Sequence, residues 1–293
     1  MRITSGLYQG TEEIVVVTDD GVYRGGSLRR MRAQVARTMG EVLSVGDRAV
    51  AELDAALHQA QIQGLAPDDD PDAWLAPVPH PDKVICVGLN YRPHVQESGQ
   101  SLPDSPVLFP KYASALVGPG ATVYPPAETR QLDYEAELVL VIGRTCHQVN
   151  ESEALDYVLG YCNGNDISAR DLQFRTSQWL LGKTCDGFGP IGPYLVTRDT
   201  VSRPNLLHIE GRRNGKVVQT SNTAEMIFSC AYLVSYISQY ITLAPGDVIF
   251  TGTPEGVVLG YPELQRDWLK PGEKFTVAIE GLGELVTHIG ESR

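Results

Sequence analysis

The stretch LDYEAELVLVIG, which runs from Leu132 to Gly143, indicates the fold more clearly than any other part of the chain. Alternate residues of a strand point to the same face, so Glu135 and Glu137 share one face. Both faces from Glu137 to Ile142 are apolar, which predicts a strand buried on both sides of its sheet. Two carboxylates at the end of such a strand repel each other and lose hydration unless a cation neutralises them. A solvated strand end would hold the same two glutamates without any ligand.

A second polar segment favours the cation. The residues from Asn165 to Gln173, NDISARDLQ, close an apolar stretch and add Asp166 as a third carboxylate. Neither acidic motif contains a His or a Cys. Such a set of ligands suits a hard ion that prefers oxygen, Mg²⁺ or Mn²⁺, and disfavours zinc.

Short β-branched segments bounded by Gly, Pro or Asn predict that strands dominate the rest of this region. They are Val84–Gly88, Val107–Phe109, Glu137–Ile142, Tyr194–Val196, Leu206–Glu210, Val217–Gln219, Val248–Thr251, Phe275–Ile279 and Leu285–His288. Asn214-Gly215 predicts a hairpin. One helix is predicted from Thr223 to Tyr240, with Asn222 as its N-cap and Glu225 three residues later. The pattern is that of a mixed, β-rich α+β domain.

The N-terminal part has a different pattern. A hairpin is predicted around Asp19-Asp20-Gly21, and apolar spacing predicts a helix from Asp47 to Gln61. The segment from Gly64 to Asp82 is rich in Pro and Asp and lacks periodicity. We therefore expect a small N-terminal α/β domain over residues 1–70, a linker over 71–82 and the main domain over 83–293.

Composition limits the partners and the compartment. The chain has 36 acidic and 24 basic side chains and a formal net charge of −12, so neither nucleic acid nor an anionic membrane surface is an expected partner. The five cysteines are odd in number and form no C-x-x-C pair, which indicates reduced thiols. The sequence lacks a cationic segment followed by an apolar run, and no stretch is apolar enough to span a membrane. A cytoplasmic location is expected.

At five motifs the chain resembles the fumarylacetoacetate hydrolase superfamily. They occur in the family's order over roughly residues 83 to 290: Val87-Gly88-Leu89-Asn90-Tyr91 with His94, Asp133 to Leu138, Asn165-Asp166 to Gln173, Leu181-Gly182-Lys183, and Gly252 to Val257. The resemblance implies a rolled β core with a metal at its mouth, and a homodimer. It also implies that Glu135, Glu137 and Asp166 bind the metal. One departure is Gly187, where relatives often carry a hydroxyl residue.

The resemblance also implies roles for further residues. His94 and Glu97, at i and i+3 after Pro93, would form a dyad that activates water on a lid; without the family context, an incidental contact on a solvated helix is the simpler interpretation. Lys183 is expected to be catalytic. The residues expected to bind substrate are Tyr91, Arg170, Gln173 and Thr253. Lys111 and Ser114 could approach the pocket as Tyr91 does, although a packing or structural role suits each of these three better.

These assignments predict a metal-dependent hydrolase that cleaves a carbon–carbon bond in a 2,4-dioxo acid, of acylpyruvate or fumarylpyruvate type, through a metal-bound enolate. The alternatives are an oxaloacetate-type decarboxylase, a 2-hydroxy-dienoate isomerase, and a sugar-acid lyase or dehydratase. A metabolite-binding relative without turnover is the alternative outside enzymology. The expected ligand in every case is a small 2-oxo acid.

Overall fold

A long sheet connects the two parts of the molecule in the computed structural model, which describes residues 1–293. Its strands, in spatial order, are β3 (Gly21–Arg24), β2 (Thr11–Thr18), β1 (Arg2–Tyr8), β13 (Gly189–Thr197), β11 (Val158–Asn165), β10 (Ala136–Ile142), β16 (Val248–Phe250), β5 (Val84–Gly88) and β6 (Val107–Lys111). Two short strands lie off this path: β4 (Ala73–Leu75) pairs with β1, and β7 (Leu116–Val117) pairs with β13.

A second sheet packs against the middle of the first. Its order is β15 (Lys216–Asn222), β14 (His208–Arg213), β17 (Lys274–Ile279), β18 (Gly283–Ile289) and β8 (Thr122–Val123). Strands β14 and β17 contact β10, while β17 and β18 contact β11. A two-stranded ladder joins β9 (Leu132–Asp133), which precedes β10 in the chain, to β12 (Ser168–Ala169), which follows β11. The predicted β-rich α+β fold is confirmed.

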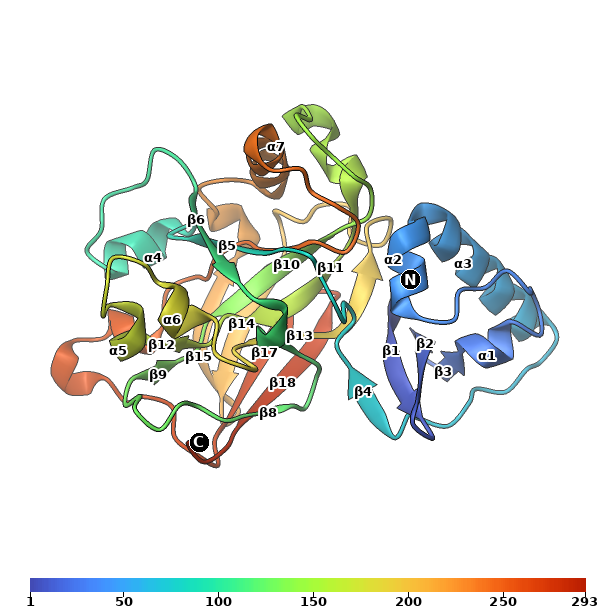
Figure 1. Cartoon of the computed structure of the whole chain (residues 1–293), viewed down its shortest axis with the longest axis horizontal. Coiled ribbons are helices and arrows are strands. Elements are labelled where there is room, and N and C mark those ends of the chain that lie inside the picture. The colour runs from blue at the N-terminus through green and yellow to red at the C-terminus, as the bar shows by residue number, and fades with distance from the viewer.

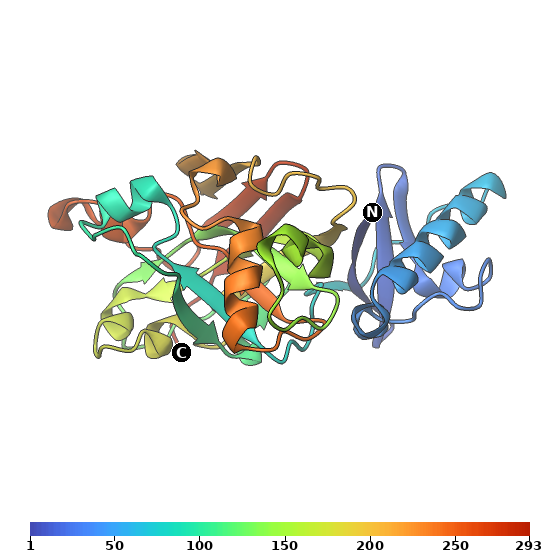
Figure 2. The same ribbon diagram turned by 90° about the horizontal axis from the view of Figure 1, so that it is seen from above.

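Seven α-helices accompany the sheets. They are α1 (Gly25–Leu28), α2 (Met39–Val45), α3 (Asp47–Ile62), α4 (Arg92–Glu97), α5 (Arg170–Gln173), α6 (Leu180–Lys183) and α7 (Cys230–Tyr240). Five 3₁₀ turns complete the chain: η1 (Ala113–Ala115), η2 (Glu151–Tyr157), η3 (Thr223–Glu225), η4 (Val258–Gly260) and η5 (Glu263–Gln265). Figures 1 and 2 show β1 to β3 and α1 to α3 gathered at one end of the molecule, with the other helices around the main body.

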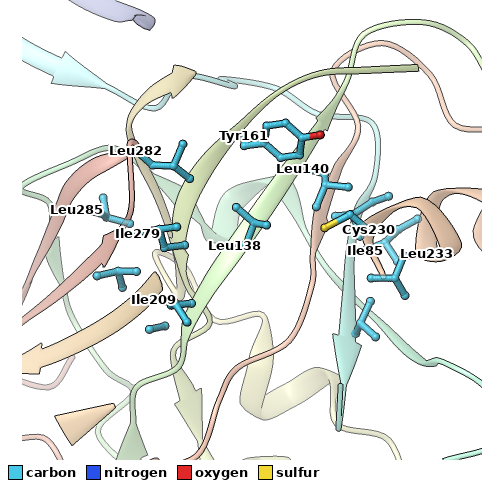
Figure 3. Packing of buried hydrophobic residues seen from close by; sticks show 14 of the residues in the cluster. Ile85, Leu138, Leu140, Tyr161, Ile209, Cys230, Leu233, Ile279, Leu282 and Leu285 are labelled. Atoms are coloured by element: carbon cyan, nitrogen blue, oxygen red, sulfur yellow. The ribbon is translucent and has the colours of Figure 1, made fainter. Parts of the chain in front are cut away.

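Strand β10 is buried on both faces, as its sequence predicts. Leu138 and Leu140 belong to the core cluster between the two sheets, together with Ile209 and Ile279 (Figure 3). Val139 and Val141, which point to the other face of β10, belong to a second cluster that also contains residues of α3 such as Leu53. Every residue of β10 is buried. The strand that carries Glu137 is therefore held rigidly from both sides.

The two predicted hairpins form as expected. Thr18 pairs with Gly21 across the turn between β2 and β3, and Arg213 pairs with Lys216 between β14 and β15. At the second turn Asn214 and Gly215 both have positive φ, 51° and 84°. This conformation matches the twist of the strands that flank a two-residue hairpin, and Asn-Gly adopts it most readily.

The helix predicted from Thr223 to Tyr240 is wrong in its first half. Residues Thr223–Glu225 form a 3₁₀ turn that Asn222 caps, and the α-helix begins only at Cys230, with Ser229 as its N-cap. The reason is tertiary. The Asn90 side chain accepts a hydrogen bond from Phe228 N at 2.8 Å and donates one to Phe228 O at 3.1 Å, so this backbone is not free to form helical bonds.

Two long strands were not predicted, and the expected linker is partly ordered. Strands β1 and β11 have no counterpart in the sequence-based prediction, because their small and polar residues, such as Gly6 and Asn163, obscure the strand pattern.

Within residues 71–82, the expected linker, β4 pairs with β1, and Val78 is fully buried in the second core cluster. The proposed division at residues 70 to 83 thus falls in a packed segment.

Candidate active site and metal centre

Three carboxylates converge where β10 begins and β11 ends. Strand pairing sets Ala136 opposite Asn165, and Asp166 N donates a hydrogen bond to Glu135 O at 3.0 Å. One ligand oxygen from each of Glu135, Glu137 and Asp166 lies within 4.8 Å of the others. Their exposed fractions are 5%, 1% and 0%, so hydration cannot offset their mutual repulsion.

Cationic side chains neutralise two of the three carboxylates. Lys183 Nζ lies 2.7 Å from Glu135 Oε2 and 2.8 Å from Asp166 Oδ2. Arg170 Nη2 lies 2.6 Å from Glu135 Oε1, and Lys111 Nζ lies 2.6 Å from Asp166 Oδ1. Burial alone would raise the pKa of the Glu135 carboxyl, but Lys183 and Arg170 outweigh it and lower this pKa to about 2.

Glu137 has no cationic partner. Its Oε2 accepts one hydrogen bond, from Gly252 N at 2.7 Å. Burial, followed by the charges of Asp166 and Glu135, raises the pKa of its carboxyl well above the usual value. Four buried carboxylates, including Asp133, thus face only three cationic side chains, Lys111, Arg170 and Lys183. An unneutralised carboxylate within an all-oxygen donor set fits a hard divalent cation.

Glu135 and Glu137 border a cavity of about 730 Å³. Glu135, Glu137, Arg170 and Lys183 line its inner part, and residues of α4 and of the segment from Leu259 to Arg266 also contribute to its wall. Asp166 and Lys111 are buried and do not reach the wall. A molecule in the cavity therefore contacts the two glutamates directly.

The expected dyad forms at this cavity. His94 Nδ1 lies 3.3 Å from Glu97 Oε2, and both residues line the wall. Both carboxylate oxygens of Glu97 also accept a hydrogen bond from Gly256 N at 3.1 Å. Pro93 lies in the first turn of α4, where its missing N–H has no consequence. Because Glu97 engages Nδ1, Nε2 of His94 is the nitrogen that can exchange a proton with a ligand.

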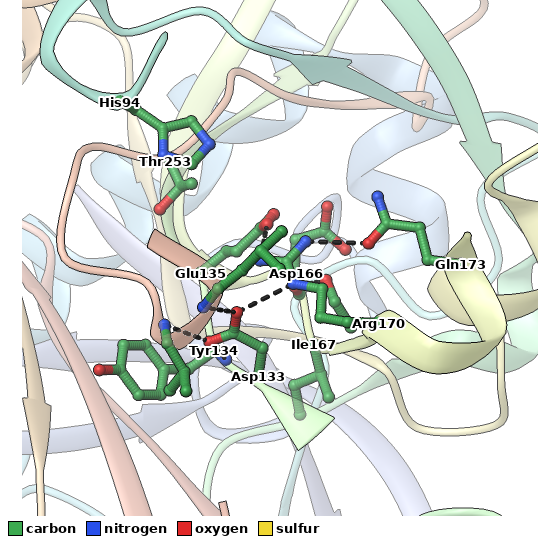
Figure 4. A network of polar contacts seen from close by, with 12 residues as sticks. His94, Asp133, Tyr134, Glu135, Asp166, Ile167, Arg170, Gln173 and Thr253 are labelled. Carbon is green, nitrogen blue, oxygen red and sulfur yellow. Dashed lines mark hydrogen bonds and ion pairs between the residues drawn. The ribbon is translucent and has the colours of Figure 1, made fainter. Parts of the chain in front are cut away.

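Arg170 and Gln173 are brought together, both on α5. Arg170 Nη1 donates to Gln173 Oε1 at 3.0 Å and Nε donates to Asp133 Oδ2 at 2.9 Å (Figure 4). This contact leaves the Gln173 amide nitrogen available on the cavity wall. Thr253 also lines the cavity, but its hydroxyl donates to Ala136 O at 3.0 Å and accepts from Gln219 at 2.9 Å.

Tyr91 is the predicted substrate-binding residue that the structure keeps away from the cavity. Its side chain is fully buried in the core between the sheets and is absent from the cavity wall. Its hydroxyl has no hydrogen-bond partner. The expected departure at Gly187 has a backbone reason, since φ is 80° there and side chains with a Cβ rarely adopt that value.

Three residues that sequence reasoning did not assign to the site support it. Lys111 pairs with Asp166, which is distant from it in the chain, and no local signal indicates this. Gln219 accepts from Ala136 N at 2.9 Å and donates to Thr253 Oγ1, which connects the two glutamates to the Gly252 turn. Asp133 accepts from Arg170 and from Val258 N at 2.8 Å. Its place two residues before Glu135 was the available signal, because alternation puts it on the same face.

A buried carboxylate cluster that opens into a cavity with a His–Glu dyad is typical of metal-dependent enzymes that act on small organic acids. Comparisons with known proteins agree. Residues 83–290 match the family described as "Fumarylacetoacetate (FAA) hydrolase C-terminal". The chain is 40% identical to oxaloacetate tautomerase Fahd2a, mitochondrial, of Rattus norvegicus over 291 residues, which cover 99% of this chain and 91% of the relative. The chain therefore belongs to the fumarylacetoacetate hydrolase family.

Solved structures give the same result. Fumarylacetoacetate hydrolase from psychrophilic Exiguobacterium antarcticum matches with 34% identity and a TM-score of 0.85, and 5-carboxymethyl-2-hydroxymuconate delta-isomerase from Mycobacterium smegmatis with 30% and 0.77. In both cases 100% of each chain is covered. The expected family and fold are confirmed.

The location and assembly of the protein are less constrained. No helix in the structure has the length and apolar character needed to cross a bilayer. The rat relative is mitochondrial by name, so the expected cytoplasmic location stays a prediction, as does the homodimer.

Proposed function

We propose that the protein is a divalent-metal-dependent enzyme that interconverts the keto and enol forms of a 2-oxo dicarboxylic acid of the oxaloacetate type. The observation that carries the proposal is that Glu135, Glu137 and the His94–Glu97 dyad line one cavity. Similarity over nearly the whole chain to an oxaloacetate tautomerase favours tautomerisation over the hydrolysis that the sequence put first.

Glu135, Glu137 and Asp166 are the residues that would hold the ion, Mg²⁺ or Mn²⁺. The bound ion would supply Lewis-acid polarisation of the 2-oxo group, which acidifies the neighbouring C3–H bond. The buried cluster then carries a net positive charge, because a divalent ion more than offsets the unneutralised carboxylate. This local charge overcomes the net charge of −12 and attracts an anionic substrate.

The chain's own side chains would move the proton and orient the substrate. His94 Nε2 accepts a proton from C3 of the keto form, while Glu97 holds the imidazole and stabilises its charged state. We assign the Lys183 ammonium as the proton donor to the 2-oxygen, so that the enol has the composition of the keto acid. The imidazolium then releases its proton to solvent and Lys183 takes one up, which returns both side chains to their starting states. We assign the Gln173 amide nitrogen, on the cavity wall, to the substrate's carboxylate, while Arg170 holds the Gln173 oxygen.

Hydrolysis of an acylpyruvate is the second candidate, and the ordered dyad favours it. In that reaction His94 takes a proton from water, and the resulting hydroxide attacks the distal carbonyl. The carbon–carbon bond then breaks, its electron pair passes to the pyruvate fragment, and a proton from the imidazolium completes the balance. Tautomerisation and hydrolysis need the same groups but different substrates.

A substrate panel separates the two candidates. Metal-loaded protein is mixed with enol or keto oxaloacetate, and the approach to equilibrium is followed by the ultraviolet absorbance of the enol; parallel samples contain acylpyruvates. The proposal predicts faster equilibration of oxaloacetate, abolished by a chelator and restored by Mg²⁺ or Mn²⁺. Cleavage of acylpyruvates without any effect on oxaloacetate would establish the hydrolase. Oxalate binding without turnover of any substrate would establish the metabolite-binding alternative.

A further inference from the structure

One cation on the cavity wall has no part in the carboxylate cluster. Arg266 follows η5 and lines the same cavity as Glu135 and Glu137. Its Nε donates to Tyr261 O at 2.9 Å, and no carboxylate oxygen lies within 4.0 Å of its guanidinium nitrogens. The neighbouring Asp267 is bound instead by Lys270 and Arg213. The two terminal amino groups of Arg266 are therefore free for a ligand.

The other cations of the wall are already committed. Arg170 binds Asp133, Glu135 and the Gln173 oxygen. Lys183 bridges Glu135 and Asp166. A second anionic group on a substrate would lose hydration in the cavity and would need a cation that is not already paired with a carboxylate. Arg266 is the one lining residue that supplies it.

The segment that carries Arg266 is anchored to the metal side of the site. Asp133 accepts hydrogen bonds from Val258 N at 2.8 Å and Leu259 N at 3.0 Å while it binds Arg170. After Arg266 the chain is fixed again by a bond from Leu269 N to Leu132 O at 2.9 Å. Figures 1 and 2 show η4 and η5 at the same end of the molecule as α4 and α5. The backbone on both sides of Arg266 is thus fixed to the segment of Leu132 and Asp133.

We propose that Arg266 binds the distal carboxylate of the substrate, so that the site selects 2-oxo dicarboxylic acids over 2-oxo acids with an apolar end. The inference rests on the proposed function for the orientation of the substrate, with its 2-oxo acid end at Glu135 and Glu137. The planar guanidinium suits a carboxylate in two-point contact, which discriminates by geometry as well as by charge. Arg266 is in this sense a specificity-determining residue.

Binding of two matched ligands tests this inference without any turnover. 2-Oxoglutarate and 2-oxopentanoate have the same carbon count and differ only in a terminal carboxylate or methyl group. Titration calorimetry of the Mg²⁺-loaded protein should give a roughly 10- to 100-fold lower Kd for the diacid, the range expected for a hydrogen-bonded ion pair. Arg266→Gln should abolish this preference and leave the Kd of 2-oxopentanoate unchanged, and Arg266→Lys should restore part of it.

The control is Arg48→Gln, an exposed arginine on α3 that is absent from the cavity wall. It should retain the full preference. Equal Kd values for the two ligands in the wild-type protein, failure to bind either, or a preference that survives in Arg266→Gln would overturn the inference. The proposed function fails separately, if the protein prefers the diacid but does not accelerate oxaloacetate equilibration.

Discussion

Glu97 lies directly against Gly260, with no room between them for a methyl group. A Cβ built on Gly260 would overlap the Glu97 carboxylate. The same carboxylate accepts the Gly256 N–H and faces His94, so the glycine allows the dyad to close onto the segment that follows Gly252. The absence of a side chain at position 260 therefore lets the His94–Glu97 pair take its position at the cavity wall.

Gly260→Ala should displace Glu97 and lower kcat by about 10-fold or more, because misplacing a catalytic group by an ångström is costly. The Kd for Mg²⁺ should not change, since the metal ligands are not touched. Steady-state kinetics and metal titration measure the two effects. Gly40→Ala is the matched control, because its Cβ would make only an ordinary contact, 3.7 Å from Thr38 Oγ1. An unaltered kcat in Gly260→Ala would remove Glu97 from the reaction.

A substitution at His94 tests whether its imidazole transfers the proton in the reaction. His94→Ala should lower turnover by the order of 10²-fold, the usual contribution of a general base. The exposed His58 on α3 supplies a control, and His58→Ala should retain wild-type turnover. Turnover assays of the two variants on the best substrate decide the matter. Equal turnover in both would show that proton transfer uses another group.

In the metal-free protein, removing the charge of Glu135 and removing that of Glu137 should change the free energy of unfolding in opposite directions. The raised pKa of Glu137 means that the folded state binds more protons than the unfolded chain, so its contribution to stability falls as pH rises above the usual carboxyl range. Glu137→Gln should therefore raise the free energy of unfolding at pH 7, by about 1–3 kcal/mol. Denaturant titration at several pH values measures this, and the gain should shrink toward pH 4.

Glu135→Gln is the counterpart. The lowered pKa of Glu135, about 2, means that its stabilising ion pairs are present above the usual carboxyl pKa and are lost as pH falls toward 2. Removing this charge takes from Arg170 and Lys183 one of the two carboxylates that each binds and leaves them Asp133 and Asp166. The loss of these charged hydrogen bonds should cost about 1–3 kcal/mol at pH 7. If both variants shifted stability in the same direction, the assigned ion pairing would be incorrect.

Metal binding should stabilise the protein. A ligand that binds only the folded state at 100 times its Kd adds about 2.7 kcal/mol, so Mg²⁺ or Mn²⁺ should raise Tm and a chelator should reverse the shift. Because Glu137 must lose its proton to bind the ion, metal affinity should increase with pH. Thermal melts and metal titrations from pH 5 to 8 test this. An affinity independent of pH would argue against Glu137 as a ligand.

A substitution at Gln219 tests whether this side chain holds the backbone between Glu135 and Glu137 in place. Gln219→Leu removes the contacts to Ala136 N and Thr253 Oγ1. The Thr253 hydroxyl keeps its bond to Ala136 O, but the buried Ala136 N–H loses the acceptor that Gln219 supplies. We expect a loss of stability of about 1–3 kcal/mol for this unpaired group and a weaker affinity for Mg²⁺. Gln63→Leu, at the exposed end of α3, is the control and should leave both quantities close to their wild-type values. Unchanged metal affinity in Gln219→Leu would limit this residue to a structural role.

The sequence alone determined the double burial of β10, the shared face of Glu135 and Glu137, and the hairpin at Asn214-Gly215. These features follow from side-chain alternation and turn conformation, which act over a few residues. The order of the motifs was sufficient to identify the family and to propose eight of the 21 residues that line the cavity, among them both glutamates and the His94–Glu97 pair.

Only the tertiary structure decided which distant groups complete the site. Lys111 reaches Asp166, Asp133 joins Arg170 to the segment of Val258, and Asn90 interrupts the predicted helix. Tyr91 was expected at the substrate and instead packs in the core. Bonds of this kind link a side chain to whichever buried polar group packing brings near it, and packing depends on the whole chain rather than on any local pattern.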